Sequence, residues 1–322
     1  MKYEEFIEQL QARTGSRPVE DGFKARIAEI AKGFDGSLDE LNERIKRAVE
    51  EQNRAPHQNF AGLSSEEMHY LLYYPLEENS PVRLRPNIAD EILEKIAFLR
   101  LVEELLKIVK RDGAIKLTAK LETLPRKVLV ELYDHHFISH WPIDDASLIL
   151  RHEDDWSVMG SLHAVVCISH LVRKIHGKLV LTKLGEKMLS PTHRAELFRL
   201  VLNAFTREFN WAYNDFYPDF LLCRDAFGFS VYLVARLGKN ETHKNLYAEK
   251  FLTAFPMSLE DFQTASYGTP EGNFRSCYTL RTFDRFLEWF NLVEVRHDAK
   301  TDWKYHKSLV KKSKLMDAVF LI

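Results

Sequence analysis

The amino-acid sequence predicts an α+β fold that is mostly α-helical and organised as several compact units. Its 322 residues are 45% hydrophobic and 29% charged, which is ordinary globular usage and sufficient for a buried core. Apolar residues recur at spacings of three and four along most of the chain, as they do in amphipathic helices. Strictly alternating stretches, which are typical of strands, are few and short.

Residues 1–58 are predicted to form a helical N-terminal unit of three short amphipathic helices. The first covers residues 3–12, and the second lies around Ile27. The third follows Ser37, which pairs with Glu40 in a capping box and so satisfies two free amides at a helix start.

Residues 59–140 are predicted to form a helical region with the first strand-containing module. A long helix is expected over residues 88–111 and ends at Gly113. The alternating residues 114–119 predict a strand. A further helix is expected to start at Pro125, because proline suits the first turn of a helix.

The clearest local pattern lies between residues 156 and 189. An apolar helix over residues 156–169 leads into two short strands, residues 171–174 and 178–181. The turn between them contains Gly177, which adopts a positive φ without strain. Thr182 is then predicted to cap another short helix.

This succession of helix, hairpin and capped helix resembles the second half of a winged helix-turn-helix domain. The segment Leu179-Val-Leu-Thr-Lys-Leu-Gly carries the resemblance and defines a winged-helix-like module over residues 141–191. A partial echo at Lys116-Leu-Thr-Ala-Lys suggests that the module is repeated. The resemblance therefore implies two or three winged-helix-like modules in the chain.

A C-terminal winged-helix-like module is predicted over residues 265–322. Residues 265–275 are expected to form a loop. An amphipathic helix over residues 279–290 is followed by a strand from Leu292, a turn, and a return strand over residues 303–307. This order again resembles a recognition helix followed by a wing.

Residues 192–264 are predicted to form an aromatic-rich helical core that joins the modules. Residues 198–232 contain eleven aromatic residues, whereas the overall aromatic content of 12% predicts about four. These residues are Phe198, Phe205, Phe209, Trp211, Tyr213, Phe216, Tyr217, Phe220, Phe227, Phe229 and Tyr232.

A second resemblance rests on the combination of the segment from Pro75 to Pro86, Leu124-Pro-Arg-Lys, and Phe209-Asn-Trp-Ala-Tyr. This combination is similar to a group of uncharacterised bacterial proteins. It implies no particular activity.

The C-terminal module is the better candidate for contact with DNA or RNA. Residues 296–314 contain seven basic and two acidic side chains, and such a local patch binds phosphates even when the total charge is balanced. The candidate nucleic-acid-binding residues are Arg281 and Arg285 on the helix, and Arg296, Lys300, Lys304 and Lys307 on the wing and beyond it.

The module over residues 141–191 offers a smaller basic set on its wing, namely Arg173, Lys174 and Lys178. The helix before that wing has no Arg, Lys, Asn or Gln over residues 160–169, and these side chains read base edges most often. Base recognition by this helix is therefore not expected, and two interpretations of the wing stay open: its basic residues contact phosphates, or they form a solvated sheet edge that discourages aggregation.

The balance of charge keeps a second function open. With 45 basic and 47 acidic residues, the formal net charge is −2, and a protein whose whole surface binds nucleic acid usually carries a positive excess. The modules could instead be protein-interaction domains of an adaptor or scaffold that binds no nucleic acid. A regulatory or nucleic-acid-associated protein remains the first hypothesis.

Enzymatic function has little support in the sequence. There is no dinucleotide-binding, Walker-type, GxSxG or HExxH motif, and we predict no catalytic residue, cofactor or metal ligand. His163, Cys167 and His170 share one helix face, but their apolar neighbours indicate core packing. A metal-dependent hydrolase that uses the histidines around residues 135–140 is the third alternative.

The expected location is the cytoplasm. The N-terminal residues mix acidic and apolar side chains and lack the apolar run of a signal peptide, and no stretch approaches roughly 18 apolar residues. The cysteines Cys167, Cys223 and Cys277 are widely separated, which predicts free thiols in a reducing compartment. No membrane association is predicted.

Overall fold

The computed structural model describes residues 18–32, 34–213, 215–263, 268–296 and 308–322. The chain divides into two compact units. The first comprises Met1–Gln58 with Gly62–Glu66, and the second comprises Asn59–Ala61 with Glu67–Ile322.

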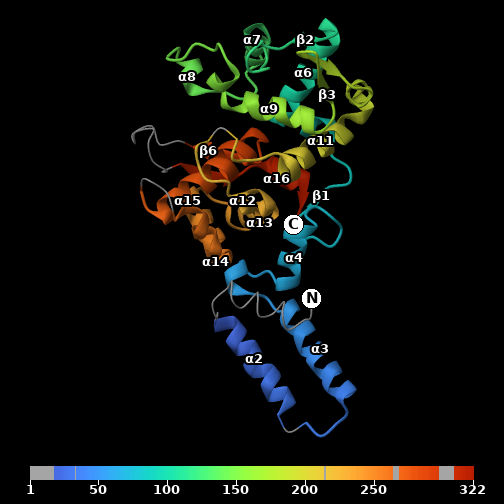
Figure 1. Ribbon diagram of the computed structural model, residues 1–322, viewed down its shortest axis with the longest axis vertical. Coiled ribbons are helices and arrows are strands. Elements are labelled where there is room, and N and C mark those ends of the chain that lie inside the picture. The colour runs from blue at the N-terminus through green and yellow to red at the C-terminus, as the bar shows by residue number, and fades with distance from the viewer. Residues whose placement is uncertain (1–17, 33, 214, 264–267, 297–307) are drawn as a thin grey trace. The chain divides into compact units, whose positions relative to one another are not determined.

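The first unit contains a helical hairpin of α2 (Pro18–Ala31) and α3 (Leu38–Arg54), shown in blue in Figure 1. The predicted capping box at the start of α3 is confirmed. The Ser37 hydroxyl accepts a hydrogen bond from the Glu40 amide, and the Ser37 amide donates to the Glu40 carboxylate at 2.9 Å. The helix predicted over residues 3–12 lies outside the described residues.

After the hairpin the chain continues as mostly helical structure with short strands. The α-helices are α4 (Ser65–Tyr73), α5 (Asp90–Leu93), α6 (Ala97–Asp112), α7 (Arg126–Tyr133), α8 (Trp141–Asp144), α9 (Ser157–Ile168), α10 (Lys183–Met188), α11 (Arg194–Asn203), α12 (Leu221–Asp225), α13 (Phe227–Leu237), α14 (Lys244–Ala254), α15 (Pro270–Thr279) and α16 (Lys314–Val319). The 3₁₀ helices are η1 (Gln58–Phe60), η2 (Glu153–Asp155), η3 (Pro191–His193) and η5 (Pro256–Phe262), and the π-helical segments are η4 (Ala204–Glu208) and η6 (Leu280–Leu287).

The strands are β1 (Arg83–Leu84), β2 (Ile115–Lys116), β3 (Val172–Ile175), β4 (Lys178–Leu181), β5 (Thr242–His243), β6 (Val293–Arg296), β7 (Leu309–Lys312) and β8 (Phe320–Leu321). All their pairings are antiparallel. Within the described ranges they form sheets in the orders β1-β8, β2-β4-β3 and β5-β7-β6. The fold is therefore α+β and mostly α, as the sequence predicts.

Elements α6 to α10 (residues 97–188), green to yellow in Figure 1, are called the first module. Its order is helix, strand, two main helices, β-hairpin, and capped helix. The predicted hairpin is confirmed, with Gly177 at φ +69° in the turn. The predicted cap is also confirmed, because the Thr182 hydroxyl accepts from the Gly185 amide at 3.0 Å.

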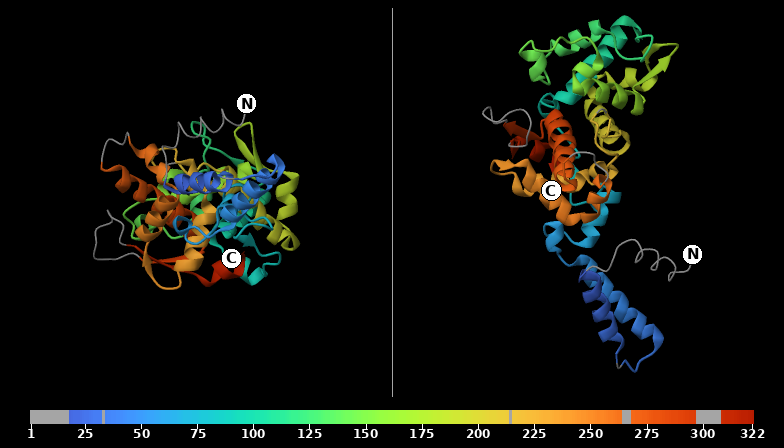
Figure 2. Two further views of the ribbon diagram at one scale, coloured as in Figure 1. Left: turned by 90° about the horizontal axis from the view of Figure 1, so that it is seen from below. Right: turned by 60° about the vertical axis from the view of Figure 1, so that its left-hand side comes forward.

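Elements α13 to α16 (residues 227–319) are called the second module and repeat the order of the first. Within the second unit the two modules are neighbours, as the right-hand view of Figure 2 also shows. The last helix before each hairpin ends in a left-handed residue, His170 at φ 56° and Asn291 at φ 54°. The last helix of the second module is capped by Ser313, just as Thr182 caps α10.

The aromatic segment over residues 192–264 lies at the centre of the second unit. Of its eleven clustered aromatic residues, eight are buried, and Tyr213, Phe216 and Tyr217 are not. Phe205 illustrates the packing, because its ring contacts Phe98 of the first module and Phe290 of the second at centroid distances of 5.2 Å.

Some expected boundaries are wrong. The helix expected over residues 88–111 is interrupted before α6, where Ile96 is extended at ψ 100°. The expected loop over residues 265–275 contains the start of α15, which Thr269 caps. The expected return strand over residues 303–307 lies outside the described residues, and β6 pairs instead with β7.

The sequence similarity between the segments at Lys116 and Leu179 does not come from a repeated module. The two segments are neighbouring strands of one sheet, with Lys116 paired to Lys178. This sheet also crosses the domain boundary expected at residue 140. The structural repeat instead relates the corner at Leu171 to the corner at Leu292, because both follow a left-handed residue and precede a hairpin.

In the part of the chain that the structure describes, no helix is both long and apolar enough to span a membrane.

Candidate functional site

The sheet β2-β4-β3 of the first module has one buried face and one exposed face. Side chains alternate between the two faces of a strand. Ile115 of β2 pairs with Leu179 of β4, and both are buried in the core of the module. Lys116 and Lys178, next along the same strands, are therefore directed to the outer face, and so is Arg173 of β3.

The register places two lysines directly opposite each other on this outer face. Lys116 is the cross-strand partner of Lys178, and Arg173 is the partner of Val180. Like charges directly opposite in an antiparallel pair destabilise a sheet. All three basic side chains are exposed, and within the described ranges no carboxylate forms an ion pair with them. The outer face is thus a concentration of unneutralised positive charge.

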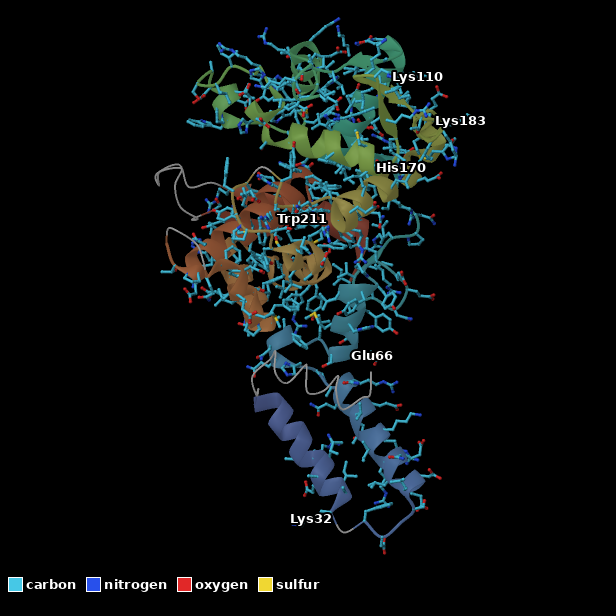
Figure 3. The ribbon with its side chains drawn as sticks, in the orientation of Figure 1. Lys32, Glu66, Lys110, His170, Lys183 and Trp211 are labelled. Carbon is cyan, nitrogen blue, oxygen red and sulfur yellow. The ribbon has the colours of Figure 1, made fainter. Side chains whose placement is uncertain are left out.

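Further lysines extend this charge along the edge of the module. Lys110 at the end of α6, Lys120 after β2, and Lys183 at the start of α10 are all exposed. Lys110 and Lys183 are labelled on the same side of the module in Figure 3. Lys174 is partly neutralised, since its ammonium lies 3.8 Å from the Glu122 carboxylate. We call Lys116, Lys178 and Arg173 with these neighbours the wing patch.

The hairpin of the second module is arranged differently. Glu294 of β6 is the cross-strand partner of Lys311 in β7, so this pair is complementary. Arg296 binds Glu241 at 2.7 Å, and Lys312 binds Asp317 at 2.7 Å. The remaining predicted residues of this wing, Lys300, Lys304 and Lys307, lie outside the described residues.

The prediction that Arg281 and Arg285 face nucleic acid is wrong, because both lie in the interior. The Arg281 guanidinium forms a bidentate pair with Asp215 at 2.7 and 3.0 Å, and both side chains are fully buried. Arg285 donates to the Tyr213 carbonyl at 2.9 Å. The four-residue spacing correctly placed both arginines on one helix face, but that face is turned toward the loop at residues 211–220.

Burial affects the pKa values of both arginines. Burial is the largest influence and opposes the charge on Arg281, but its hydrogen bonds to Asp215 and the negative charge nearby together outweigh burial, so the pKa of Arg281 is raised. Burial dominates at Arg285 and lowers its pKa. The two arginines hold the loop at residues 211–220 against η6, which is a structural role.

The helix that precedes the hairpin, called the third helix of each module, is also largely buried. It is α9 in the first module and α15 with η6 in the second. In α9 the residues from Val158 to His163 are all buried, and the helix lies on the side of the first module that faces the second (Figure 1). In the second module, α15 and η6 bury Phe274, Tyr278, Phe283 and Phe286. Neither helix therefore presents a basic face that could enter a groove of duplex DNA.

The residues considered for metal binding do not assemble a site. His163 is buried and its Nδ1 lies 3.0 Å from the Glu153 carboxylate, whereas His170 is exposed. His140 contacts the Tyr133 hydroxyl through its backbone, with its amide donating to the hydroxyl and its carbonyl accepting from it. Among the described residues, no three His, Cys, Asp or Glu side chains are grouped closely enough to hold a metal ion. The hydrolase alternative thus gains no geometric support.

Comparison with known proteins finds no family model, no curated protein and no solved structure that matches this chain.

Sequence reasoning found Arg173, Lys174 and Lys178 but missed Lys116, Lys110, Lys120 and Lys183. Lys116 lies on a strand that the alternation predicts, so its outward direction was available from the sequence. Its position opposite Lys178 was not, because the two residues are 62 positions apart and only the sheet brings them together.

Proposed function

We propose that the protein binds nucleic acid through the phosphate backbone, without reading base sequence, and that the wing patch of the first module is the contact surface. The observation that carries this proposal is the direct pairing of Lys116 with Lys178 on an exposed sheet face. A polyanion relieves the repulsion between two opposed ammonium groups, and each phosphate contact releases counterions from the nucleic acid.

We further propose that both modules are winged-helix domains. The order of helix, strand, two helices and hairpin supports this assignment, and so does the sheet order, in which the first strand pairs with the last. The resemblance at Leu179-Val-Leu-Thr-Lys-Leu-Gly points the same way. In this class of domain the third helix often enters the major groove while the wing contacts the backbone.

The burial of the third helices favours backbone contact over base readout. A helix packed into a domain core cannot present side chains to base edges, whereas a wing on the surface reaches phosphates freely. Binding should accordingly be similar for DNA sequences of different composition and should depend steeply on salt.

The test is a fluorescence-anisotropy titration with random duplex DNA and RNA at about 50 and about 200 mM salt. The test variant replaces Lys116, Lys178 and Arg173 with alanine. We expect this variant to bind at least about tenfold more weakly than the wild type at low salt. The slope of the logarithm of its binding constant against the logarithm of the salt concentration should be smaller in magnitude by about three.

A matched control removes the same charge from another surface. Lys95, Lys239 and Lys250 are exposed lysines of the second unit outside the wing patch, and their triple alanine variant should bind like the wild type. If both triple variants lose affinity equally, the binding reflects total charge and not the wing patch. Absence of binding by the wild type at low salt contradicts the proposal.

An adaptor or scaffold is the second candidate, and a separate observation favours it. Phe216 and Leu221 are exposed apolar side chains close together in the chain, and exposed aromatic residues of this kind are common in protein interfaces. Replacing both with serine should leave nucleic-acid binding unchanged, and co-purification of a partner that is lost in this variant would support the adaptor.

A further inference from the structure

A cavity of about 380 Å³ lies where the two modules meet in the second unit. The first module contributes residues 137–142 and the start of α9, and the second module contributes residues 284–291. This volume falls within the range of sites that bind small molecules. The cavity belongs to neither wing and is separate from the wing patch.

The charge that faces the cavity is negative. Its lining includes the carboxylates of Asp284 and Glu288, which are four residues apart on one helix, and the described part of the chain contributes no arginine or lysine to it. The ammonium of the buried Lys244 is bonded to Asp284 and so neutralises that carboxylate. Burial lowers the pKa of His140, the histidine in the lining, and this favours its neutral form.

Among the described residues, Glu288 therefore forms no ion pair with a lysine or an arginine. Burial raises its pKa to about 7, and the neighbouring Asp284 adds to this effect, while Lys244 partly opposes it. A carboxyl group with this pKa is poised between its protonated and ionised forms at neutral pH. A positively charged ligand beside it would shift it to the ionised form.

Aromatic rings form much of the remaining wall. Phe137, Trp141, Trp156 and Trp289 all line the cavity, and Trp141 is 69% exposed. Tryptophan is the ring that attracts cations most strongly over its face. Trp156 is buried, and its indole nitrogen has no hydrogen-bond partner within the described part of the chain.

From this combination we propose that the cavity binds a small organic cation, with a primary ammonium or guanidinium group beside Glu288 and an apolar body between the tryptophan rings. The carboxylate supplies the charge, the rings supply apolar and cation–π contact, and the walls from both modules enclose the ligand. This inference does not depend on nucleic-acid binding.

The experiment uses three probes with the same aromatic body and different charge. These are 2-phenylethylammonium, 2-phenylethanol and 3-phenylpropanoate, titrated into the full-length protein and followed by calorimetry and tryptophan fluorescence. We expect the ammonium to bind at least about tenfold more tightly than the alcohol, and the carboxylate to bind least. Equal binding of all three probes, or no saturable binding of the ammonium, overturns the proposal.

Variants then assign the binding to the cavity. Glu288→Gln keeps the size of the side chain and removes its charge, so the preference for the ammonium over the alcohol should disappear. Glu294→Gln removes an exposed carboxylate of β6 outside the lining and should have no effect. Trp141→Ala tests the ring at the exposed end of the cavity and should weaken binding of all three probes.

The pH dependence gives a readout that a merely structural change would not reproduce. The ammonium should bind the ionised form of Glu288, so its affinity should rise by about tenfold between pH 6 and pH 8 in the wild type. This rise should be absent in Glu288→Gln. A rise that persists in this variant would assign the titration to another group, such as His140, and would contradict the role of Glu288.

Discussion

The two modules share one order of elements but use their charged residues in opposite ways. In the first module Lys116 and Lys178 oppose each other on an exposed sheet face with no carboxylate partner among the described residues. At the corresponding strands of the second module, β5 and β7, Thr242 opposes Val310 and His243 opposes Leu309, and within its hairpin Glu294 opposes Lys311. Arg281 and Arg285 of the second module are directed inward, where Arg281 pairs with Asp215.

This difference teaches that the number of basic residues in a segment does not measure its free positive charge. The C-terminal segment has the higher density of lysine and arginine in the sequence, yet Arg296 and Lys312 are held by carboxylates from distant or neighbouring elements. The wing of the first module has fewer basic residues, but Arg173 and Lys178 form no ion pair with any described carboxylate. A phosphate is attracted by positive charge that no neighbouring carboxylate neutralises, and not by the number of basic residues as such.

The largest expected effect concerns the inward charges of the second module. Arg281→Ala should lower the free energy of unfolding by about 3–5 kcal/mol, because the buried Asp215 carboxylate loses its bidentate partner and keeps only the longer contact with Arg285 at 3.6 Å. Urea denaturation at neutral pH measures this loss. The exposed substitution Lys311→Ala serves as the control and should change stability little. If the Arg281→Ala variant had normal stability but impaired DNA binding, Arg281 would belong to the nucleic-acid-binding surface and this expectation would be wrong.

A smaller effect is expected for Glu288, a half-buried carboxyl group of the second module. Its pKa is raised from 4.5 to about 7, so the folded protein binds a proton more tightly than the unfolded chain does. The contribution of Glu288 to the free energy of unfolding should therefore fall as the pH rises from about 4.5 to about 7. Glu288→Gln should raise the free energy of unfolding at pH 8 by about 1–3 kcal/mol and remove this dependence. Equal pH profiles of the two proteins would contradict the expectation.

The comparison of the wings can be reversed by one substitution. Glu294→Lys gives the second hairpin a lysine opposite Lys311, so that β6 and β7 carry opposed lysines as β2 and β4 do in the first module. We expect tighter binding to duplex DNA at low salt and a salt slope increased by about one. Glu271→Lys, at the exposed start of α15, adds the same charge elsewhere and controls for net charge. If both variants gain the same affinity for duplex DNA, opposed lysines confer no advantage over a single lysine added elsewhere.

The smallest effect is the relief of repulsion in the first wing. Lys116→Glu converts the opposed lysines into a complementary pair and should stabilise the protein by about 0.2–1 kcal/mol. This gain should shrink as salt is added, because exposed charges are screened. Thermal unfolding at two salt concentrations measures it. A loss of stability would indicate that Lys116 makes a favourable contact in the folded protein.

Much of the local structure follows from the sequence because its causes are local. The cap at Thr182, the positive φ of Gly177 and the capping box at Ser37 each depend on residues within a few positions. The mostly helical α+β class follows from the spacing of apolar residues in the same way.

Less of the candidate sites can be predicted from the sequence. Lys178 and its two neighbours on the wing were predicted, whereas Lys116 became part of the patch only through the register of the sheet. The cavity joins Trp141 and Trp156 to Glu288, which lies more than 100 residues away in the sequence. No local pattern marks such a combination.

By itself, then, the sequence determined the elements, their caps and the faces on which side chains lie, because hydrogen bonds and alternation act over short distances. The tertiary structure alone decided which charges are neutralised. Arg281 and Lys178 look equivalent in the sequence, but one meets a buried carboxylate 66 positions away and the other meets a lysine across a strand. The free energy of a charge depends on its burial and on its partner, and both are set by segments that only the fold brings together.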